Sequence, residues 1–186
     1  MSGYACNKDN GHCQPEVIKI TISSDTARSG SVSTAGIPNS KLLVGDDTSN
    51  ANLYAFVYFD TSTIPKGSVI QTAELVIYQA LLARQPYTVL GNMKVEHVAY
   101  TNLTNAHQLE SDKNEDRTIS VDTNKGDKDA NVSSMLMDDF EAGKRNSQFL
   151  FRFENNSNGD GAADYAQIDP TGDTRPRLII EYHAAQ

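Results

Sequence analysis

The sequence predicts an all-β fold, a jelly-roll β-sandwich of two antiparallel sheets with one short α-helix at about residues 132–142. Short runs with two-residue alternation predict the strands, and polar loops between them predict the turns. One segment only has helical spacing. The 186 residues suffice for one sizeable core but are few for two ordinary domains. We therefore expect a single domain over residues 1–186, with residues 1–16 as an N-terminal extension.

The alternation is clearest in three segments, at residues 17–23, 148–154 and 177–182. In each segment, every second residue is apolar, which is the pattern of a strand with one face on a core. The apolar residues are Ile18, Ile20 and Ile22; Phe149, Phe151 and Phe153; and Leu178, Ile180 and Tyr182. Further strands are expected in "KLLVG", "MKVEHVAY" and "TISV".

Residues 53–60, "LYAFVYFD", are apolar on both faces, as in a central strand that is covered on each side. A polar turn built on Pro65 and Gly67 follows, and then "AELVIYQ" alternates again. The sequence therefore predicts that these two strands pair as a hairpin-like unit.

The helical segment lies in "DANVSSMLMDDFEAGKR". Val132, Met135, Leu136 and Phe140 follow one another at i, i+3, i+4 and i+8, which places them on one helix face. Gly143 stands where a helix commonly ends. We expect a short amphipathic helix that closes one end of the sandwich.

The charge of the chain limits its partners. The formal net charge is −8 and the isoelectric point is about 4.9, and lysine and arginine are scattered, so a nucleic-acid partner is not expected. No window approaches the roughly 18 apolar residues of a membrane span. We therefore expect no membrane span.

The two cysteines, Cys6 and Cys13, flank an Asn-Gly turn. A disulfide between them would close a small loop and contribute about 2–3 kcal/mol in the chain-entropy model. Free thiols, or a metal site that also uses His12, are the alternatives. A disulfide would indicate an exported protein, so we expect a secreted or cell-surface location.

The order of motifs resembles the DNRLRE-type domain, which is related to family 96 carbohydrate-binding modules and to disaggregatase-related surface domains. The shared pattern is a Val-Gly strand end, an "FD-x-S-x-IP-x-G-x-x-I-x-x-A-x-L" core, a short helix that ends at glycine, and a closing "RP-x-L-x-x-x-Y" strand. The resemblance spans roughly residues 17–182. The matching residues are Val44 and Gly45; Phe59, Asp60, Ser62, Ile64, Pro65, Gly67, Ile70, Ala73 and Leu75; Gly143; and Arg175, Pro176, Leu178 and Tyr182.

Such domains are secreted jelly rolls, found in cell-surface proteins and beside polysaccharide-degrading enzymes. The resemblance therefore implies a non-catalytic carbohydrate-binding module that binds a polysaccharide. The alternative is a structural or adhesive surface domain without a sugar site, which contacts other domains of a larger chain or copies of itself.

A structural calcium ion is expected in "NNSNGDGAAD". Asn156, Asn158 and Asp160 occupy positions 1, 3 and 5 of a calcium-loop pattern, and Asp164 occupies position 9. Alternate oxygen-bearing side chains around a tight turn converge on one point, which suits calcium. Position 12 is Gln167 in place of glutamate, and a plain loop of turn-forming residues is the alternative. The acidic loops at residues 45–50 and 122–129 are further candidates.

A sugar contact requires exposed rings and planar polar groups, because a sugar has an apolar face and a rim of hydroxyls. Tyr87, with Arg84 and Gln85 nearby in the same loop, is the first candidate, and Tyr100 is the second. The alternative for each ring is burial in the core. An acidic polysaccharide would additionally need gathered cations. These could be Arg84, Lys94, Lys144 and Arg145.

Catalytic motifs are weak in this sequence. "YFDTST" lacks the glycine of an aspartic-protease motif after Thr61, and the four histidines have no metal-site spacing. The sequence therefore predicts a protein that is not an enzyme.

Overall fold

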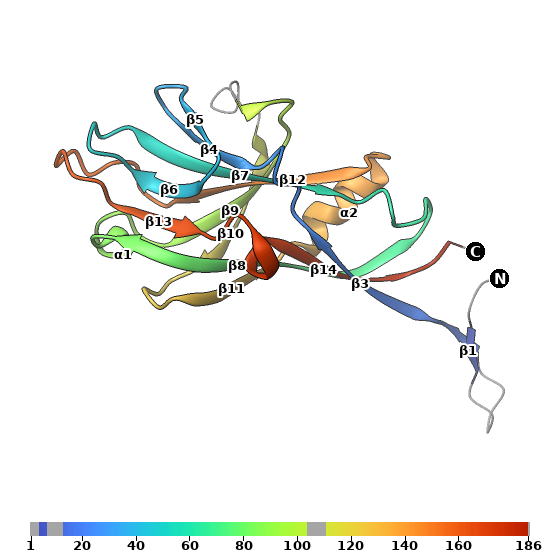
Figure 1. Cartoon of the computed structure of the whole chain (residues 1–186). Helices are drawn as coiled ribbons and strands as arrows, with labels where there is room; N and C mark the ends of the chain where they lie inside the picture. The colour runs from blue at the N-terminus through green and yellow to red at the C-terminus, as the bar shows by residue number, and fades with distance from the viewer. Residues whose placement is uncertain (1–3, 7–12, 104–110, 186) are drawn as a thin grey trace.

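The computed structural model describes residues 4–6, 13–103 and 111–185, and β-strands dominate it (Figure 1). The predicted all-β class is confirmed. The predicted helix is α2, Ser133–Glu141, and two further short helical turns are α1, Pro86–Val89, and η2, Gly172–Thr174. The strands before the first helix are β3 Val17–Ser23, β4 Gly30–Ser33, β5 Pro38–Asn39, β6 Leu42–Asp46, β7 Asn52–Asp60 and β8 Val69–Ala83. Those after it are β9 Met93–Val98, β10 Ser111–Ser120, β11 Gly126–Asn131, β12 Asn146–Phe153, β13 Tyr165–Ile168 and β14 Arg177–His183.

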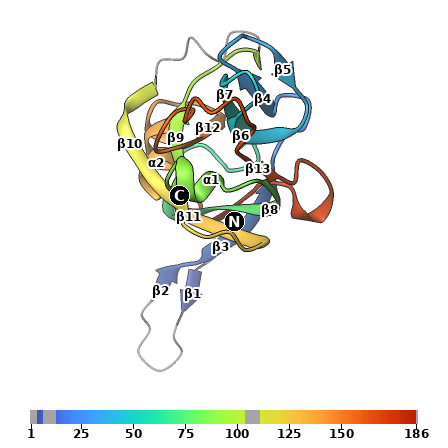
Figure 2. The same cartoon turned by 90° about the vertical axis from the view of Figure 1, so that its left-hand side faces the viewer.

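These strands form one curled antiparallel sheet. Its main path runs β10-β9-β12-β7-β6-β13-β8-β14-β3; β11 pairs with β8, and β4 pairs with β7 and β5. The short β6–β7 pairing joins the half around β7 to the half around β8, so strands β3 to β14 form one continuous sheet rather than the two sheets that the sequence predicts. Seen from the end that carries α1, the strands surround a common interior (Figure 2).

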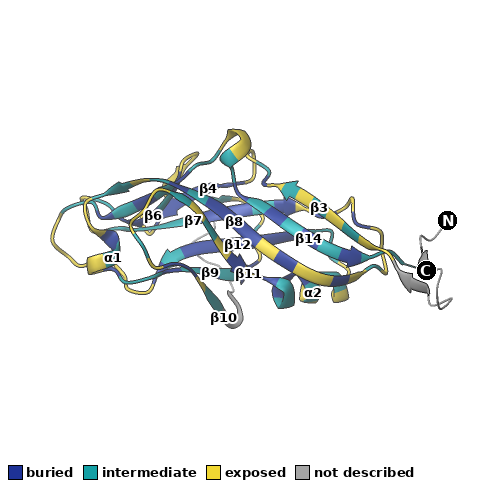
Figure 3. Ribbon diagram, turned by 90° about the horizontal axis from the view of Figure 1, so that it is seen from below, coloured by how far each residue is buried: buried dark blue, intermediate teal, exposed yellow. Residues whose placement is uncertain are grey.

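The core lies between the two halves of the curled sheet. Its largest cluster takes the inward residues of β7, β9 and β12 from one half and those of β8, β13 and β14 from the other. Half-buried and buried residues therefore alternate along β14 (Figure 3). The predicted inward phenylalanines Phe149, Phe151 and Phe153 all belong to this cluster.

Strand β7 is covered on both faces, as its sequence predicts. Ala55, Val57 and Phe59 point into the main core, whereas Phe56 packs on the other face with Val32 and other residues of a second, smaller cluster. The buried residues of this second cluster come from the neighbouring strands β9, β12, β7 and β4, so the cluster lies on the outer face of this half of the sheet.

The predicted hairpin of residues 53–79 is wrong. Strand β7 pairs with β12, β4 and β6, whereas β8 pairs with β13, β14 and β11. Residues 61–68 instead connect the two halves of the sheet, and Ile64 of this connection is fully buried in the core. A fully buried apolar residue within an otherwise polar connection indicates that the connection crosses the core instead of forming a hairpin turn.

Helix α2 packs against β8 and β12 through its apolar face, as predicted. Val132, which precedes the helix, and Met135 and Leu136 within it are fully buried. The helix ends at Glu141, and Gly143 follows two residues later with a φ of 72°, the left-handed conformation that glycine adopts readily. In the described part of the chain, no helix has the length and hydrophobicity of a membrane span.

The N-terminal strands β1, Tyr4–Cys6, and β2, Cys13–Pro15, form a separate two-stranded sheet that projects from the end of β3 (Figure 2). Their antiparallel register places Cys6 opposite Cys13. Directly opposed residues have Cα separations of about 4.5–5.5 Å, which lie within the range of disulfides. The predicted disulfide itself lies outside the described residues, because the two cysteine side chains are not among them.

Candidate functional site

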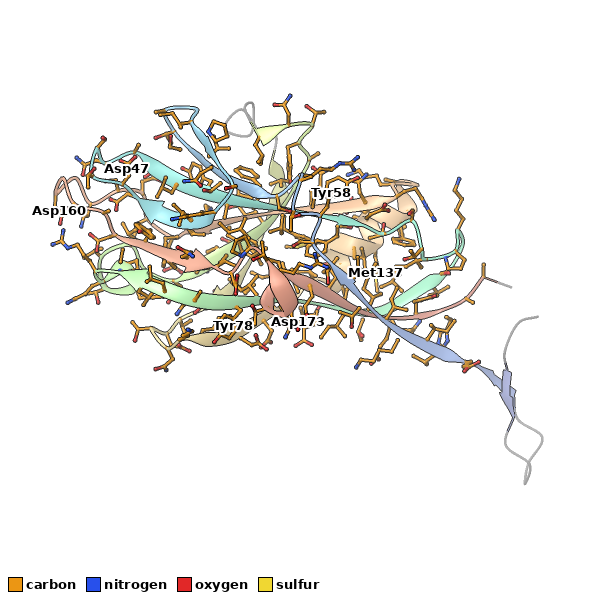
Figure 4. The ribbon with its side chains drawn as sticks, in the orientation of Figure 1. Asp47, Tyr58, Tyr78, Met137, Asp160 and Asp173 are labelled. Atoms are coloured by element: carbon orange, nitrogen blue, oxygen red, sulfur yellow. The ribbon has the colours of Figure 1, made fainter. Side chains whose placement is uncertain are left out.

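Three strands end together at the end of the molecule opposite the N-terminal hairpin. These are the C-terminal ends of β6 and β8 and the N-terminal end of β13, which lies between them. The loops that extend from them carry Asp47 and Asp160, which lie at this same end (Figure 4). We call this region the β13 end.

On the outer face of the β13 end, the aromatic ring of Tyr165 lies between a glycine and an alanine. Tyr165 lies directly opposite Gly45 of β6 on one side and Ala83 of β8 on the other. Directly opposed residues project their side chains from the same face of a sheet. Tyr165 and Gln167 face outward, because Ala166 between them is fully buried. The half-buried ring of Tyr165 is therefore not walled in by its cross-strand neighbours.

Arg84 lies at the edge of this surface, directly after Ala83. Its Nη1 is 3.2 Å from Asp160 Oδ2 and 3.9 Å from Asp164 Oδ2, and about half of its side chain is exposed. The buried Asp164 also accepts a hydrogen bond from the Gln85 backbone N–H at 3.0 Å. Asp164 thus holds the turn at residues 84–85, directly after the end of β8 at Ala83.

Two asparagine side chains hold the neighbouring loops together. Asn50 Oδ1 accepts a hydrogen bond from the Gly161 N–H at 2.8 Å, and Asn52 Oδ1 accepts one from the Ser157 N–H at 2.8 Å. These bonds join the β6–β7 loop to the loop before β13. The loop rim of the site is therefore fixed by side chain to backbone contacts.

The predicted sugar contact Tyr87 is part of the core. Its ring packs edge-on against Phe153, with centroids 5.1 Å apart, and its hydroxyl donates to Gln79 Oε1 at 2.5 Å. Burial raises the pKa of Tyr87 to about 12. The contacts of the Tyr87 ring therefore fit the alternative of burial against the core better than an exposed surface for a sugar.

Tyr100 packs in the second apolar cluster over β7. Its ring packs edge-on against Phe56, and its hydroxyl donates to the Arg28 carbonyl oxygen at 3.0 Å. Burial raises the pKa of Tyr100 above its ordinary value. On the same face, the Arg28 guanidinium lies 4.6 Å from the ring centre of Tyr58 and covers one side of that ring. The four predicted sugar contacts therefore do not form one surface; only Arg84 and Gln85 reach the β13 end.

The predicted calcium-loop residues have other partners. Asn158 Oδ1 accepts the Asp160 N–H, Asp160 Oδ1 accepts the Ala162 N–H, and Asp160 Oδ2 pairs with Arg84. Asn156 is exposed, whereas Asp164 is buried. Within the described part of the chain, no group of three or more His, Cys, Asp or Glu side chains is arranged to hold a metal ion.

The cations that an acidic polysaccharide would need do not gather. Lys94 pairs with Glu154, Lys144 pairs with Asp139, and Arg145 donates to the Ser62 carbonyl oxygen. Arg84 pairs with Asp160 at the β13 end. Each cation is thus engaged by a different part of the molecule.

Sequence reasoning missed Tyr165, although a signal was present. "DYAQID" alternates polar and apolar residues, which places Tyr165 and Gln167 on the face opposite Ala166 and Ile168. From the sequence, residues 164–167 belong to the calcium-loop pattern, which hides their strand alternation. That its neighbours are Gly45 and Ala83 follows only from strand pairing.

The comparisons with known proteins identify no relative: no protein-family model matches the chain, and no curated protein is significantly similar to it.

Proposed function

We propose that this chain is a non-catalytic carbohydrate-binding module of a secreted or cell-surface protein, and that it binds a polysaccharide at the β13 end. The observation that carries the proposal is the placement of Tyr165 between Gly45 and Ala83, with the half-exposed Arg84 directly after Ala83. An aromatic ring with no bulky cross-strand neighbour offers a flat apolar surface to the apolar face of a sugar.

The polar groups around the ring suit the rim of a sugar. The Gln167 amide shares the outer face of β13 with Tyr165, and at the same end of the strands the Arg84 guanidinium, a planar donor, pairs with the carboxylate acceptors of Asp160. The pairing of Arg84 with Asp160 fixes both groups before a ligand arrives, which lowers the entropy cost of binding. Because the cations are dispersed and the net charge is −8, we expect a neutral rather than an acidic polysaccharide.

The motif order supports the same function, because the sequence resembles DNRLRE-type domains and family 96 carbohydrate-binding modules. The predicted export of the protein agrees with this role, since the polysaccharide that we expect it to bind lies outside the cell.

Affinity electrophoresis in gels that contain neutral or acidic polysaccharides tests the proposal. We expect the native chain to be retarded by a neutral polysaccharide, and Tyr165→Ala to weaken binding by at least about tenfold, or about 1.4 kcal/mol. Tyr58→Ala is the matched control, because Tyr58 is also a half-buried outer-face tyrosine but lies on β7.

Equal loss of retardation in the two variants, with both folded by circular dichroism, would place binding elsewhere. If no polysaccharide retards the native chain, the structural or adhesive surface domain becomes the better account.

A further inference from the structure

Two buried carboxylates face each other beneath the Tyr165 surface. The register of β6 and β13 continues past the Gly45–Tyr165 pair, because the Asp46 N–H donates to the Asp164 carbonyl oxygen at 2.9 Å. Asp46 is 0% exposed and Asp164 is 2% exposed. Two like charges directly opposite each other in a strand pair repel, and burial strengthens that repulsion.

The hydrogen bonds of this pair leave one oxygen atom without a partner. Asp46 Oδ1 accepts the Asp164 N–H at 2.9 Å, and Asp164 Oδ1 accepts the Gln85 N–H. Among the described buried side chains, Asp46 Oδ2 is the one carboxylate oxygen that has no hydrogen-bond partner. A buried polar atom in this condition commonly marks the position of an ion or a water molecule.

Arg84 compensates this charge only in part. Its Nη1 is 3.9 Å from Asp164 Oδ2 but 3.2 Å from Asp160 Oδ2, so the shorter contact is with the exposed carboxylate. No ion pair of Asp46 is present among the described residues. The interior of the β13 end therefore contains more negative than positive charge.

We propose that Asp46 and Asp164 bind one divalent cation, with calcium preferred, between the ends of β6 and β13. Calcium accepts carboxylate, main-chain carbonyl and water oxygens in flexible geometry, so two carboxylates can anchor a site that the other oxygens complete. Of the predicted calcium-loop residues, the proposed site includes Asp164 but not Asn156, Asn158 or Asp160. Its second carboxylate comes from Asp46.

Such a cation would have a defined mechanical role. It would neutralise the repulsion between the two carboxylates and tie together the strands that carry Gly45 and Tyr165. This inference does not depend on sugar binding, because the repulsion and the unpartnered oxygen exist without a ligand on the outer face.

The test is calorimetric titration of the chelator-treated chain with calcium chloride, together with its melting temperature with and without calcium. We expect one calcium ion per chain and a higher melting temperature in calcium, because a ligand that binds only the folded state stabilises it. Asp46→Asn should weaken calcium binding by at least about tenfold. Asp160→Asn, which alters the exposed calcium-loop position, should leave calcium binding intact.

The metal-free melting temperature provides a second measurement that does not need the metal. Asp46→Asn removes one of the two opposed charges, so the variant without calcium should melt at or above the temperature of the native chain. The absence of any heat of binding and any thermal shift in the native chain would overturn the proposal. So would loss of binding in Asp160→Asn with retention in Asp46→Asn, which would move the ion to the exposed loop.

Discussion

His97 and Asp139 form a buried pair, with His97 Nε2 2.8 Å from Asp139 Oδ2. The Ser147 hydroxyl donates to the same carboxylate oxygen at 2.6 Å, and Lys144 Nζ lies 2.9 Å from Oδ1. In a serine-hydrolase triad the serine contacts the histidine, whereas here the aspartate stands between the two. The arrangement instead ties α2 to β9 and β12, because the three residues come from these elements.

Removal of the Asp139 carboxylate should therefore destabilise the fold. Asp139→Ala leaves His97, Ser147 and Lys144 without their shared acceptor, and we expect the free energy of unfolding to fall by about 3–5 kcal/mol. Chemical denaturation measures this change. Asp138→Ala is the control, because Asp138 is the exposed neighbour on the same helix and should change stability by no more than about 0.5 kcal/mol. Similar losses in the two variants would contradict the role of the buried pair.

Gly45 should not tolerate a side chain. Its φ is +138°, and an added Cβ would overlap the Asp164 carbonyl oxygen and lie 2.7 Å from Tyr165 Cα. Gly126 has the same φ of +138° but no atom within 4 Å of an added Cβ. The Gly126→Ala variant therefore measures the cost of the backbone conformation alone, without steric overlap. We expect Gly45→Ala to be less stable than Gly126→Ala by about 1–3 kcal/mol, measured by urea unfolding. Equal costs would show that the β6–β13 approach is less close than described.

Cys6 and Cys13 should be oxidised to a disulfide in protein prepared without reductant. The antiparallel register places them opposite each other in β1 and β2, and thiol titration of the denatured chain should detect no free thiols. Because β1 and β2 form a sheet separate from the main one, reduction should release two thiols without lowering the main melting temperature. Two free thiols before reduction would refute the disulfide.

Stability should decline at alkaline pH through Tyr87. Burial raises the pKa of Tyr87 to about 12, above the ordinary tyrosine value of 10.0. Below pH 10 the tyrosine is neutral in both states, so its contribution is complete. Between about pH 10 and 12 the unfolded chain loses this proton first, so the free energy of unfolding falls as the pH rises.

Denaturation of Tyr87→Phe across this pH range checks the assignment. The variant loses the hydrogen bond to Gln79 and should be less stable at neutral pH by about 1–3 kcal/mol. Its stability should then fall less steeply above pH 10 than that of the native chain. An unchanged slope would assign the alkaline transition to other groups, such as Tyr100, whose pKa is also raised.

The sequence by itself determined which residues of a segment share a face. Ile18, Ile20 and Ile22 pack on the core as their alternation predicts, and α2 buries Met135 and Leu136 at the predicted spacing. The physical reason is local: the backbone conformation alone fixes the direction of successive side chains in a strand or helix.

Only the tertiary structure decided which segments meet. The sequence pattern predicted that residues 53–60 pair with residues 74–79, but the two strands belong to different halves of the sheet. It likewise could not place Asp46 against Asp164, 118 positions away, or Tyr165 between Gly45 and Ala83. Strand pairing depends on how all the apolar faces close around one core, so contacts between distant strands are set by the whole chain rather than by either segment.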